Sequence, residues 1–284
     1  MAEIFIDTEE VEIYCKVMGD GEPIIFIHGG PGMTHDYFLY PEFTDTLISL
    51  GYKLIFYDQR GCGRTQCPID KNYLNTRRMI CDMESLRKNL HLDRVNVFGH
   101  SYGSYLAMHY CTQYAKHVKK TILCNSAPFR AALMLEAANE VNNRLVELNL
   151  SDKIRNKSNS NAPSDFMEVM LLRAEAEFHD SRLIGRLARL MKNVEIDPQR
   201  FVRVNGLLAQ DYLSNVDKFN VSEVCTPIMV IHGASDFIPL SSSKLTVSMV
   251  RNGVLDLIPE CGHFPFLEKS AELAEMVDRF LKEL

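Results

Sequence analysis

Three side chains whose types can carry out acyl transfer stand just after hydrophobic segments of the chain. Ser101 lies in a Gly-x-Ser-x-Gly motif, and Asp236 and His263 each follow a late apolar run. A serine can attack a carbonyl carbon, a histidine can take up the serine's proton and pass it to the leaving group, and an aspartate can fix the histidine's tautomer. The three residues predict a serine hydrolase with Ser101 as nucleophile, His263 as base and Asp236 as acid.

The motif around Ser101 has the surroundings that an exposed nucleophile needs. Residues 95–98 alternate in the manner of a strand, and residues 105–110 have helical spacing. A serine on a sharp turn between a strand and a helix leaves no room for side chains at Gly99 and Gly103. The pattern therefore predicts that the serine hydroxyl projects from this turn into a cleft.

Backbone N–H groups near the nucleophile are expected to form an oxyanion hole. Tyr102 begins the helix after the serine, where backbone N–H groups have no helical acceptor. The other donor is expected in the glycine-rich loop 28–32, which follows a continuous apolar run typical of a buried parallel strand. We expect the N–H groups of Gly30 and Tyr102 to face the oxyanion. His28 is expected to brace this loop and not to act as the base.

The segments that carry these residues alternate between strand and helix patterns. This predicts the α/β class, with a mostly parallel central sheet and helices on both faces. The expected core spans residues 1–128 and 226–284. Residues 129–225 show no strand pattern, and helical periodicity covers residues 130–149 and 163–193. An all-helical cap is therefore expected to be inserted above the C-terminal edge of the sheet.

Three local patterns are expected to be structural. Residues 3–17 alternate as in a hairpin, and the polar stretch 151–164 is expected to divide the helices of the cap. A tight glycine-containing turn follows the strand pattern that ends before Asp58. We expect a charge-assisted pair of Asp58 with Arg60 or Arg64 to hold this turn.

Composition and charge narrow the class of function. The net charge of −6 argues against nucleic acid, which needs a basic surface. No apolar run reaches the roughly 18 residues of a membrane span, and the first ten residues carry acids where a secretory signal would be basic. Eight cysteines without a Cys-x-x-Cys pair favour reduced, buried thiols. We expect a cytoplasmic protein without metal, cofactor or membrane partner, and the oligomeric state stays open.

Five short motifs lie in the two segments expected to form the core. They are His28–Gly32, Asp58–Arg64, Gly99–Gly103, Gly233–Asp236 and Gly262–His263. Together they resemble the proline iminopeptidase family of α/β-hydrolases, and the resemblance extends over residues 20–125 and 225–284. It implies an α/β-hydrolase fold and release of an N-terminal residue, often proline, from short peptides.

The resemblance also implies a site for the free α-amino group of the substrate. Family members hold this group with glutamates of the cap or beside the catalytic acid. Glu175 matches a cap glutamate of the family, and Phe237 stands next to Asp236, where some members have a glutamate. Glu175 and Phe237 are therefore expected to bind substrate, with Glu177 and Asp211 as weaker candidates.

Two other functions are compatible with the same residues. An apolar cap stretch at residues 131–135, together with Phe237, would suit a neutral substrate of a small-molecule carboxylesterase, thioesterase or lactonase. A third reading is a ligand receptor with little turnover. The aminopeptidase is the first hypothesis, and its expected partner is a small peptide.

Overall fold

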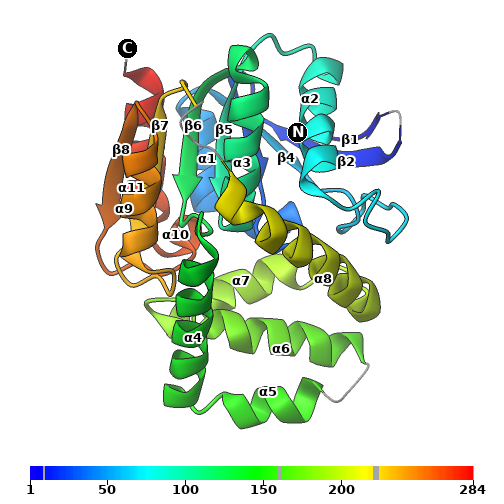
Figure 1. Cartoon of the computed structure of the whole chain (residues 1–284), viewed down its shortest axis with the longest axis vertical. Helices are drawn as coiled ribbons and strands as arrows, with labels where there is room; N and C mark the ends of the chain where they lie inside the picture. The colour runs from blue at the N-terminus through cyan, green and yellow to red at the C-terminus, as the bar shows by residue number, and fades with distance from the viewer. Residues whose placement is uncertain (9, 159–161, 220–223, 284) are drawn as a thin grey trace.

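The chain forms an eight-stranded sheet in the order β1-β2-β4-β3-β5-β6-β7-β8 (Figure 1). Its structure is a computed structural model that describes residues 1–8, 10–158, 162–219 and 224–283. The strands are β1 (Ala2–Asp7), β2 (Glu12–Met18), β3 (Glu22–Ile27), β4 (Tyr52–Tyr57), β5 (Val95–His100), β6 (Val118–Cys124), β7 (Ile228–Gly233) and β8 (Gly253–Ile258).

The sheet is parallel from β4 through β8 and antiparallel only at its first edge. β1 and β2 form the hairpin expected from the alternation of residues 3–17, and β2 also pairs antiparallel with β4. The central strands are mostly apolar and are buried along most of their length because helices cover both of their faces. The predicted α/β class with a mostly parallel sheet is confirmed.

Strand register brings the loops of the site to one edge of the sheet. Ile27 of β3 pairs with Gly99 of β5, and Gly233 of β7 pairs with Ile258 of β8. Since parallel strands end on the same side, the loops that follow these strands meet at their carboxyl ends. Ser101, one residue beyond β5, lies at this edge.

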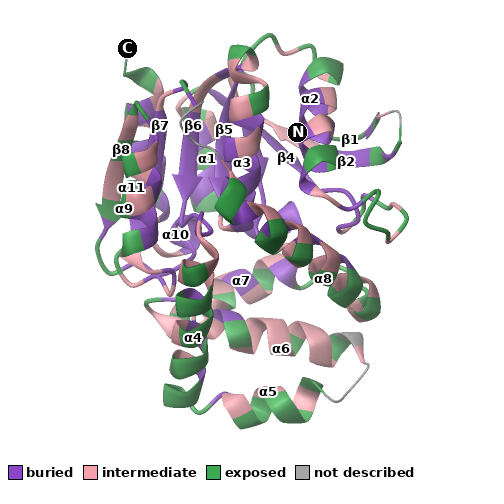
Figure 2. Ribbon diagram, viewed as in Figure 1, coloured by how far each residue is buried: buried purple, intermediate pink, exposed green. Residues whose placement is uncertain are grey.

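Two hydrophobic clusters, one on each face of the sheet, make up most of the core. One cluster joins the sheet to α2 and α3, and the other joins it to α1 and α11. Figure 2 shows the central strands almost wholly buried, with exposed residues on the outer sides of the helices. The helices of the core are α1 (Pro41–Ser49), α2 (Thr76–Asn89), α3 (Tyr102–Gln113), α9 (Leu240–Met249), α10 (Pro265–Glu268) and α11 (Ser270–Lys282).

Five α-helices between β6 and β7 lie together at one end of the sheet, and we call them the cap (Figure 1). The insertion of a helical cap agrees with the prediction. Its helices are α4 (Ala131–Glu147), α5 (Ser151–Ser158), α6 (Pro163–Glu175), α7 (Ile184–Met191) and α8 (Pro198–Asn215). No helix of the described residues is both long and apolar enough to cross a membrane.

The helices inside the cap differ from the expected ones in three places. The polar stretch 151–164 is expected to divide the helices, but it contains α5. The segment 163–193, expected to be one helical region, is broken after α6 where the chain turns toward the sheet. α8 was not predicted, although its start carries a clear signal. Asp197 caps it by accepting hydrogen bonds from two backbone N–H groups, and Pro198 occupies the first turn.

Candidate active site

Ser101 is held in a strained backbone conformation between β5 and α3. Its φ of 53° and ψ of −124° lie outside the regions that a residue with a Cβ atom usually adopts. Its N–H donates to the carbonyl oxygen of Cys124 at 3.1 Å, and its own carbonyl oxygen accepts from the N–H of Ala127 at 3.1 Å. The last residue of β6 and the loop after it therefore fix the turn from both sides.

The two glycines of the motif are required by close contacts. A Cβ atom on Gly99 would lie 2.6 Å from the carbonyl oxygen of Gly103, and a Cβ atom on Gly103 would collide with the carbonyl oxygen of Ile27. Larger residues would push the turn away from β3. The steric reason predicted for both glycines is thus confirmed.

His263 and Asp236 are both buried and are hydrogen-bonded to each other. Asp236 follows β7, His263 follows β8, and the ring atom Nδ1 lies 3.0 Å and 3.1 Å from the two carboxylate oxygens. A carboxylate can only accept, so we assign the ring proton to Nδ1. The Nε2 atom is then free to accept a proton.

Negative charge surrounds the ring of His263. Burial by itself would lower the pKa of His263, but the carboxylate of Asp236 and the charges of Glu177 and Glu268 outweigh burial and raise it. The same charges stabilise the imidazolium that forms when the ring accepts a proton.

The candidate oxyanion donors lie on the two loops that the sequence indicated. Gly30 lines the cavity together with Ser101 and has a φ of 121°, a conformation that favours glycine. The N–H of the preceding Gly29 is used by the hydroxyl of Tyr37. Tyr102 is the first residue of α3, so its N–H has no acceptor within the helix. Gly30 and Tyr102 therefore stay the candidate donors.

A chain of hydrogen bonds connects the His263 loop with the glycine-rich loop. His100 Nε2 lies 2.8 Å from the carbonyl oxygen of His263, and His100 Nδ1 lies 3.0 Å from the hydroxyl of Tyr37. This hydroxyl in turn accepts from the N–H of Gly29. Because a carbonyl only accepts, Nε2 carries the proton, and burial lowers the pKa of His100 far enough to keep the ring neutral.

Asn125 holds the acid and base loops together, a role that the sequence did not reveal. Its side-chain nitrogen donates to the carbonyl oxygen of Gly262 at 2.7 Å, and its side-chain oxygen accepts from the N–H of Gly233 at 2.8 Å. The first of these neighbours precedes His263 and the second ends β7. Nothing in the residue type or its spacing distinguishes such an asparagine from one in an ordinary turn.

A cavity of about 400 Å³ lies between core and cap, and both Ser101 and His263 line it. A second hollow of about 1050 Å³ is its neighbour and shares four lining residues with it. Much of the wall of the first cavity is apolar, which suits a substrate with hydrophobic groups. The methionines of this wall are Met33, Met167, Met170 and Met191.

The structure places Glu177, and not Glu175, in the wall of this cavity. α6 ends at Glu175, and the chain then turns so that the carbonyl oxygen of Glu177 accepts from the N–H of His263 at 2.8 Å. No described residue forms a hydrogen bond or ion pair with the Glu177 carboxylate. Burial, with a contribution from nearby Asp236, raises the pKa of Glu177. Glu175 was expected to face the substrate, but Glu177, two residues later, lines the cavity instead. The sequence did not indicate where the helix ends.

Of the other two candidates for substrate binding, Phe237 lines the cavity and Asp211 does not. Phe237 lines the cavity, and its ring centroid lies 4.6 Å from that of His263. Asp211 does not line the cavity. Its carboxylate accepts from the N–H and the hydroxyl of Thr76 at the start of α2, at 2.8 Å and 2.5 Å. Asp211 therefore anchors a core helix to α8.

Two ion pairs hold the turn after β4, and the pair made by Arg60 is buried on both sides. Asp58 pairs with Arg64 at 3.0 Å, whereas Arg60 pairs with Asp82 of α2 at 2.5 Å. Of the two partners expected for Asp58, the structure selects Arg64. His28 has the structural role expected for it. Its Nδ1 lies 2.9 Å from the carbonyl oxygen of Gly29 in its own loop, and its Nε2 accepts from the N–H of Gln59 at 3.1 Å, which joins that loop to this turn.

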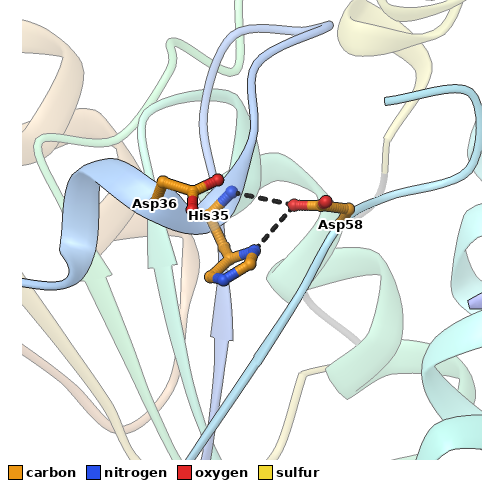
Figure 3. A group of neighbouring side chains, drawn as sticks. All are labelled: His35, Asp36 and Asp58. Atoms are coloured by element: carbon orange, nitrogen blue, oxygen red, sulfur yellow. Dashed lines mark hydrogen bonds and ion pairs between the residues drawn. The ribbon is translucent and has the colours of Figure 1, made fainter. Parts of the chain in front are cut away.

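His35, Asp36 and Asp58 form a compact group whose potential ligand atoms lie within 4.8 Å of one another (Figure 3). His35 Nδ1 lies 2.7 Å from one Asp58 oxygen, and the guanidinium of Arg64 donates to the other. Both oxygens of Asp36 also accept from Arg64. Because Arg64 already takes these oxygens, the group lacks the open ligand set that a cation needs. It fastens residues 35–38 to the turn after β4.

Comparison with known sequences agrees with this geometry. Residues 22–270 match the family model described as alpha/beta hydrolase fold. A proline iminopeptidase of Clostridium botulinum is 25% identical, and the alignment covers 100% of this chain and 99% of that protein. A proline iminopeptidase of Lactobacillus delbrueckii subsp. bulgaricus is 24% identical, with coverage of 99% and 98%.

Solved structures with a similar fold include proteins named for different activities. A proline iminopeptidase of Mycobacterium smegmatis superimposes with a TM-score of 0.75 at 19% identity, over 99% of this chain and 97% of that one. An esterase of Exiguobacterium antarcticum superimposes with a TM-score of 0.74 at 20% identity, over the full length of both chains. At this level of identity the likeness concerns the fold alone.

Proposed function

Since the chain belongs to the alpha/beta hydrolase fold family, we propose that it is a serine hydrolase that forms an acyl-enzyme on Ser101. His263 Nε2 takes the proton of Ser101 as the hydroxyl attacks the substrate carbonyl, and then gives this proton to the leaving group. Asp236 orients the ring and stabilises its charged form. The N–H groups of Gly30 and Tyr102 bind the oxyanion, and water releases the acyl group in a second, equivalent step.

We further propose that the substrate is a short peptide and that the enzyme releases its N-terminal residue. One observation carries this proposal: Glu177 lines the same cavity as Ser101 and His263. A half-buried carboxylate with no hydrogen-bond or ion-pair partner among the described residues is costly. The α-ammonium of a peptide would supply both the missing charge and the missing donors.

The other features of the site are consistent with a peptide substrate. An ammonium bound by Glu177 would place the carbonyl of the first residue near the nucleophile. The neighbouring hollow of about 1050 Å³ offers room for the remainder of a short peptide. The full-length relatives named proline iminopeptidase support the same class of reaction.

The test compares prolyl p-nitroanilide with its N-acetylated form. A site that binds the ammonium should strongly prefer the free amine, because acetylation removes the charge and adds bulk. E177Q should lower kcat/KM for the free amine by about 10- to 150-fold, as a hydrogen bond to a charged group contributes about 1.5–3 kcal/mol. At a pH above the acidic limb set by His263, it should leave kcat/KM for the acetylated compound unchanged.

E175Q is the matched control, since it makes the same change at a nearby residue that does not line the cavity. It should retain the preference of the wild type for the free amine. Equal rates on the two compounds in the wild type, or equal effects of E175Q and E177Q, would remove the aminopeptidase assignment.

A small-molecule carboxylesterase or lactonase is the second candidate. It is favoured by the apolar, methionine-rich wall and by Phe237 beside Asp236, where an ammonium would be better served by a carboxylate. Rates on acyl esters far above those on aminoacyl anilides would support it. Failure of a serine-reactive phosphonate to label Ser101 would instead point to a receptor with little turnover.

A further inference from the structure

Glu268, in the short helix α10, connects the cap with the loop that carries His263. One of its carboxylate oxygens accepts from the N–H of Gly262 at 2.9 Å and from the N–H of Phe264 at 3.4 Å. The other oxygen accepts from the N–H of His179 in the cap at 2.8 Å. A single side chain therefore holds residues on both sides of His263 and, at the same time, the segment between α6 and α7.

The cap segment also holds His263 directly. The N–H of His263 donates to the carbonyl oxygen of Glu177 at 2.8 Å, and His179 Nδ1 lies 2.8 Å from the hydroxyl of Ser235, the residue before Asp236. The backbone N–H groups of residues 262, 263 and 264 thus all donate to acceptors of Glu268 or of the cap. The position of the base depends on the cap through these bonds.

We propose that Glu268 is a positioning residue that sets the place of the His263 ring by fastening cap residues 177–179 to residues 262–264. The inference rests on the proposed hydrolase function and adds a residue that acts through the base without contacting substrate. It also makes the cap a part of the catalytic geometry, in addition to a wall of the cavity.

Only a carboxylate can make these bonds, because both of its oxygens accept. Glutamine has one accepting oxygen and one donating NH₂ group, so it can hold the cap segment or the His263 loop but not both. Turned either way, it points N–H groups at backbone N–H groups. Burial raises the pKa of Glu268, while the surrounding backbone N–H groups counteract this effect by stabilising its charged form.

The experiment uses the full chain and compares E268Q with E260Q. Glu260 lies on the same loop and carries the same charge, but its side chain is exposed and its nearest ion-pair partner is Lys269 at 3.8 Å. Rates are measured with p-nitrophenyl acetate and with prolyl p-nitroanilide, at matched amounts of folded protein judged by circular dichroism. E268Q should lower kcat by about 10- to 100-fold on each compound that the wild type hydrolyses, with little change in KM, because a small misplacement of a catalytic group costs this much.

The pH profile separates positioning from loss of stability. Asp236, Glu177, Glu268 and the neutral ring of His100 face His263. Removing the charge of Glu268 should shift the acidic limb of kcat/KM to lower pH, and E260Q should not. A reduced thermal stability alone would leave both the limb and kcat of the folded fraction unchanged. An E268Q enzyme that matches E260Q in kcat and in the limb overturns the proposal.

A backbone test applies if E268Q does not fold. H179A keeps the N–H that Glu268 accepts and H179P removes it, while both lose the ring. H179P should have the lower kcat, and equal values overturn the proposal. If the wild type hydrolyses neither compound and a phosphonate leaves Ser101 unlabelled, the proposed function itself fails. If the wild type is active and E268Q matches E260Q in kcat and in the acidic limb, the proposed role of Glu268 is wrong but the proposed function stands.

Discussion

At the scale of single residues, the site depends on how charge is arranged around His263. The ring is buried, which disfavours its charged form, yet Asp236 lies at hydrogen-bond distance and Glu177 and Glu268 add negative charge. The sum raises the pKa of His263 above its ordinary value. A base with a raised pKa accepts a proton readily but is already protonated in mildly acidic solution.

The upward shift of the His263 pKa determines how activity depends on pH. His263 must be neutral to take the proton of Ser101, so kcat/KM should fall as the pH decreases through the pKa of His263. We expect the midpoint of this limb above about 6.5, the ordinary value for histidine. D236N should move the midpoint to lower pH and reduce kcat by about 10⁴-fold, the loss known for this change in a serine protease.

Asp256 provides the control for this prediction. It lies in β8, and its carboxylate pairs with Arg279 at 2.8 Å at the surface. D256N should keep the midpoint and the rate of the wild type. A D236N enzyme with an unshifted limb would show that another group is the base.

At the scale of elements, the core was predictable because its signals are local. A buried strand shows as a continuous apolar run, and the order of strands and helices then places Ser101, Asp236 and His263 at one edge of the sheet. The cap was less predictable. Its helices pack on one another and on the core loops, so their ends are determined by contacts that are distant in sequence. The end of α6 decides that Glu177, and not Glu175, faces the cavity.

α6 lines the cavity with one helical face. Met167, Met170, Leu171 and Ala174 follow the spacing i, i+3, i+4, i+7, and all four line the cavity. Met170 is half-buried and belongs to none of the hydrophobic clusters of the described residues. Its side chain is therefore available to contact substrate, and methionine adapts to apolar groups of varied shape.

We expect M170A to change selectivity for side-chain size. The ratio of kcat/KM for leucyl to alanyl p-nitroanilide should fall by about 10-fold, the smaller end of the effect of one methylene in an apolar pocket. V169A is the control, because Val169 is half-buried on the same helix but does not line the cavity. An unchanged ratio in M170A would place the substrate side chain elsewhere.

At the scale of the whole molecule, cap and core are joined largely through backbone carbonyl groups. Arg144 of α4 donates to Ser235 at 2.8 Å, and Asn205 of α8 donates to Pro31 at 2.6 Å. Any residue type can offer a carbonyl oxygen, so the sequence gives no sign of where such a bond will end. Asn125 and Glu268 likewise bond backbone groups, which every residue type carries, so their roles could not be predicted although the triad residues could.

Stability of the core depends on a buried charge pair between two segments distant in sequence. Arg60 and Asp82 are 2% and 3% exposed at their side chains and share two hydrogen bonds, and Arg60 also pairs with Glu10 at 3.0 Å. D82N should lower the free energy of unfolding by about 3–5 kcal/mol, since it leaves most of a buried positive charge uncompensated. Urea unfolding measures this change.

An exposed pair gives the comparison. Arg182 and Asp180 lie on the surface of the cap, and D180N should change the free energy of unfolding little. A D82N protein as stable as the wild type would mean that water or Glu10 compensates Arg60 in solution. Replacing both partners with leucine should recover part of the loss, because no unpaired charge then remains.

The small cavity beneath the cap limits which molecules can reach the nucleophile. A nucleophile at the bottom of a space of about 400 Å³ can be reached by the end of a flexible fragment but not by a chain end that is packed into a folded domain. A hydrolase with such a site would therefore select its substrates by size. Under the proposed function, only material that is small or already broken down would fit beneath the five helices of the cap.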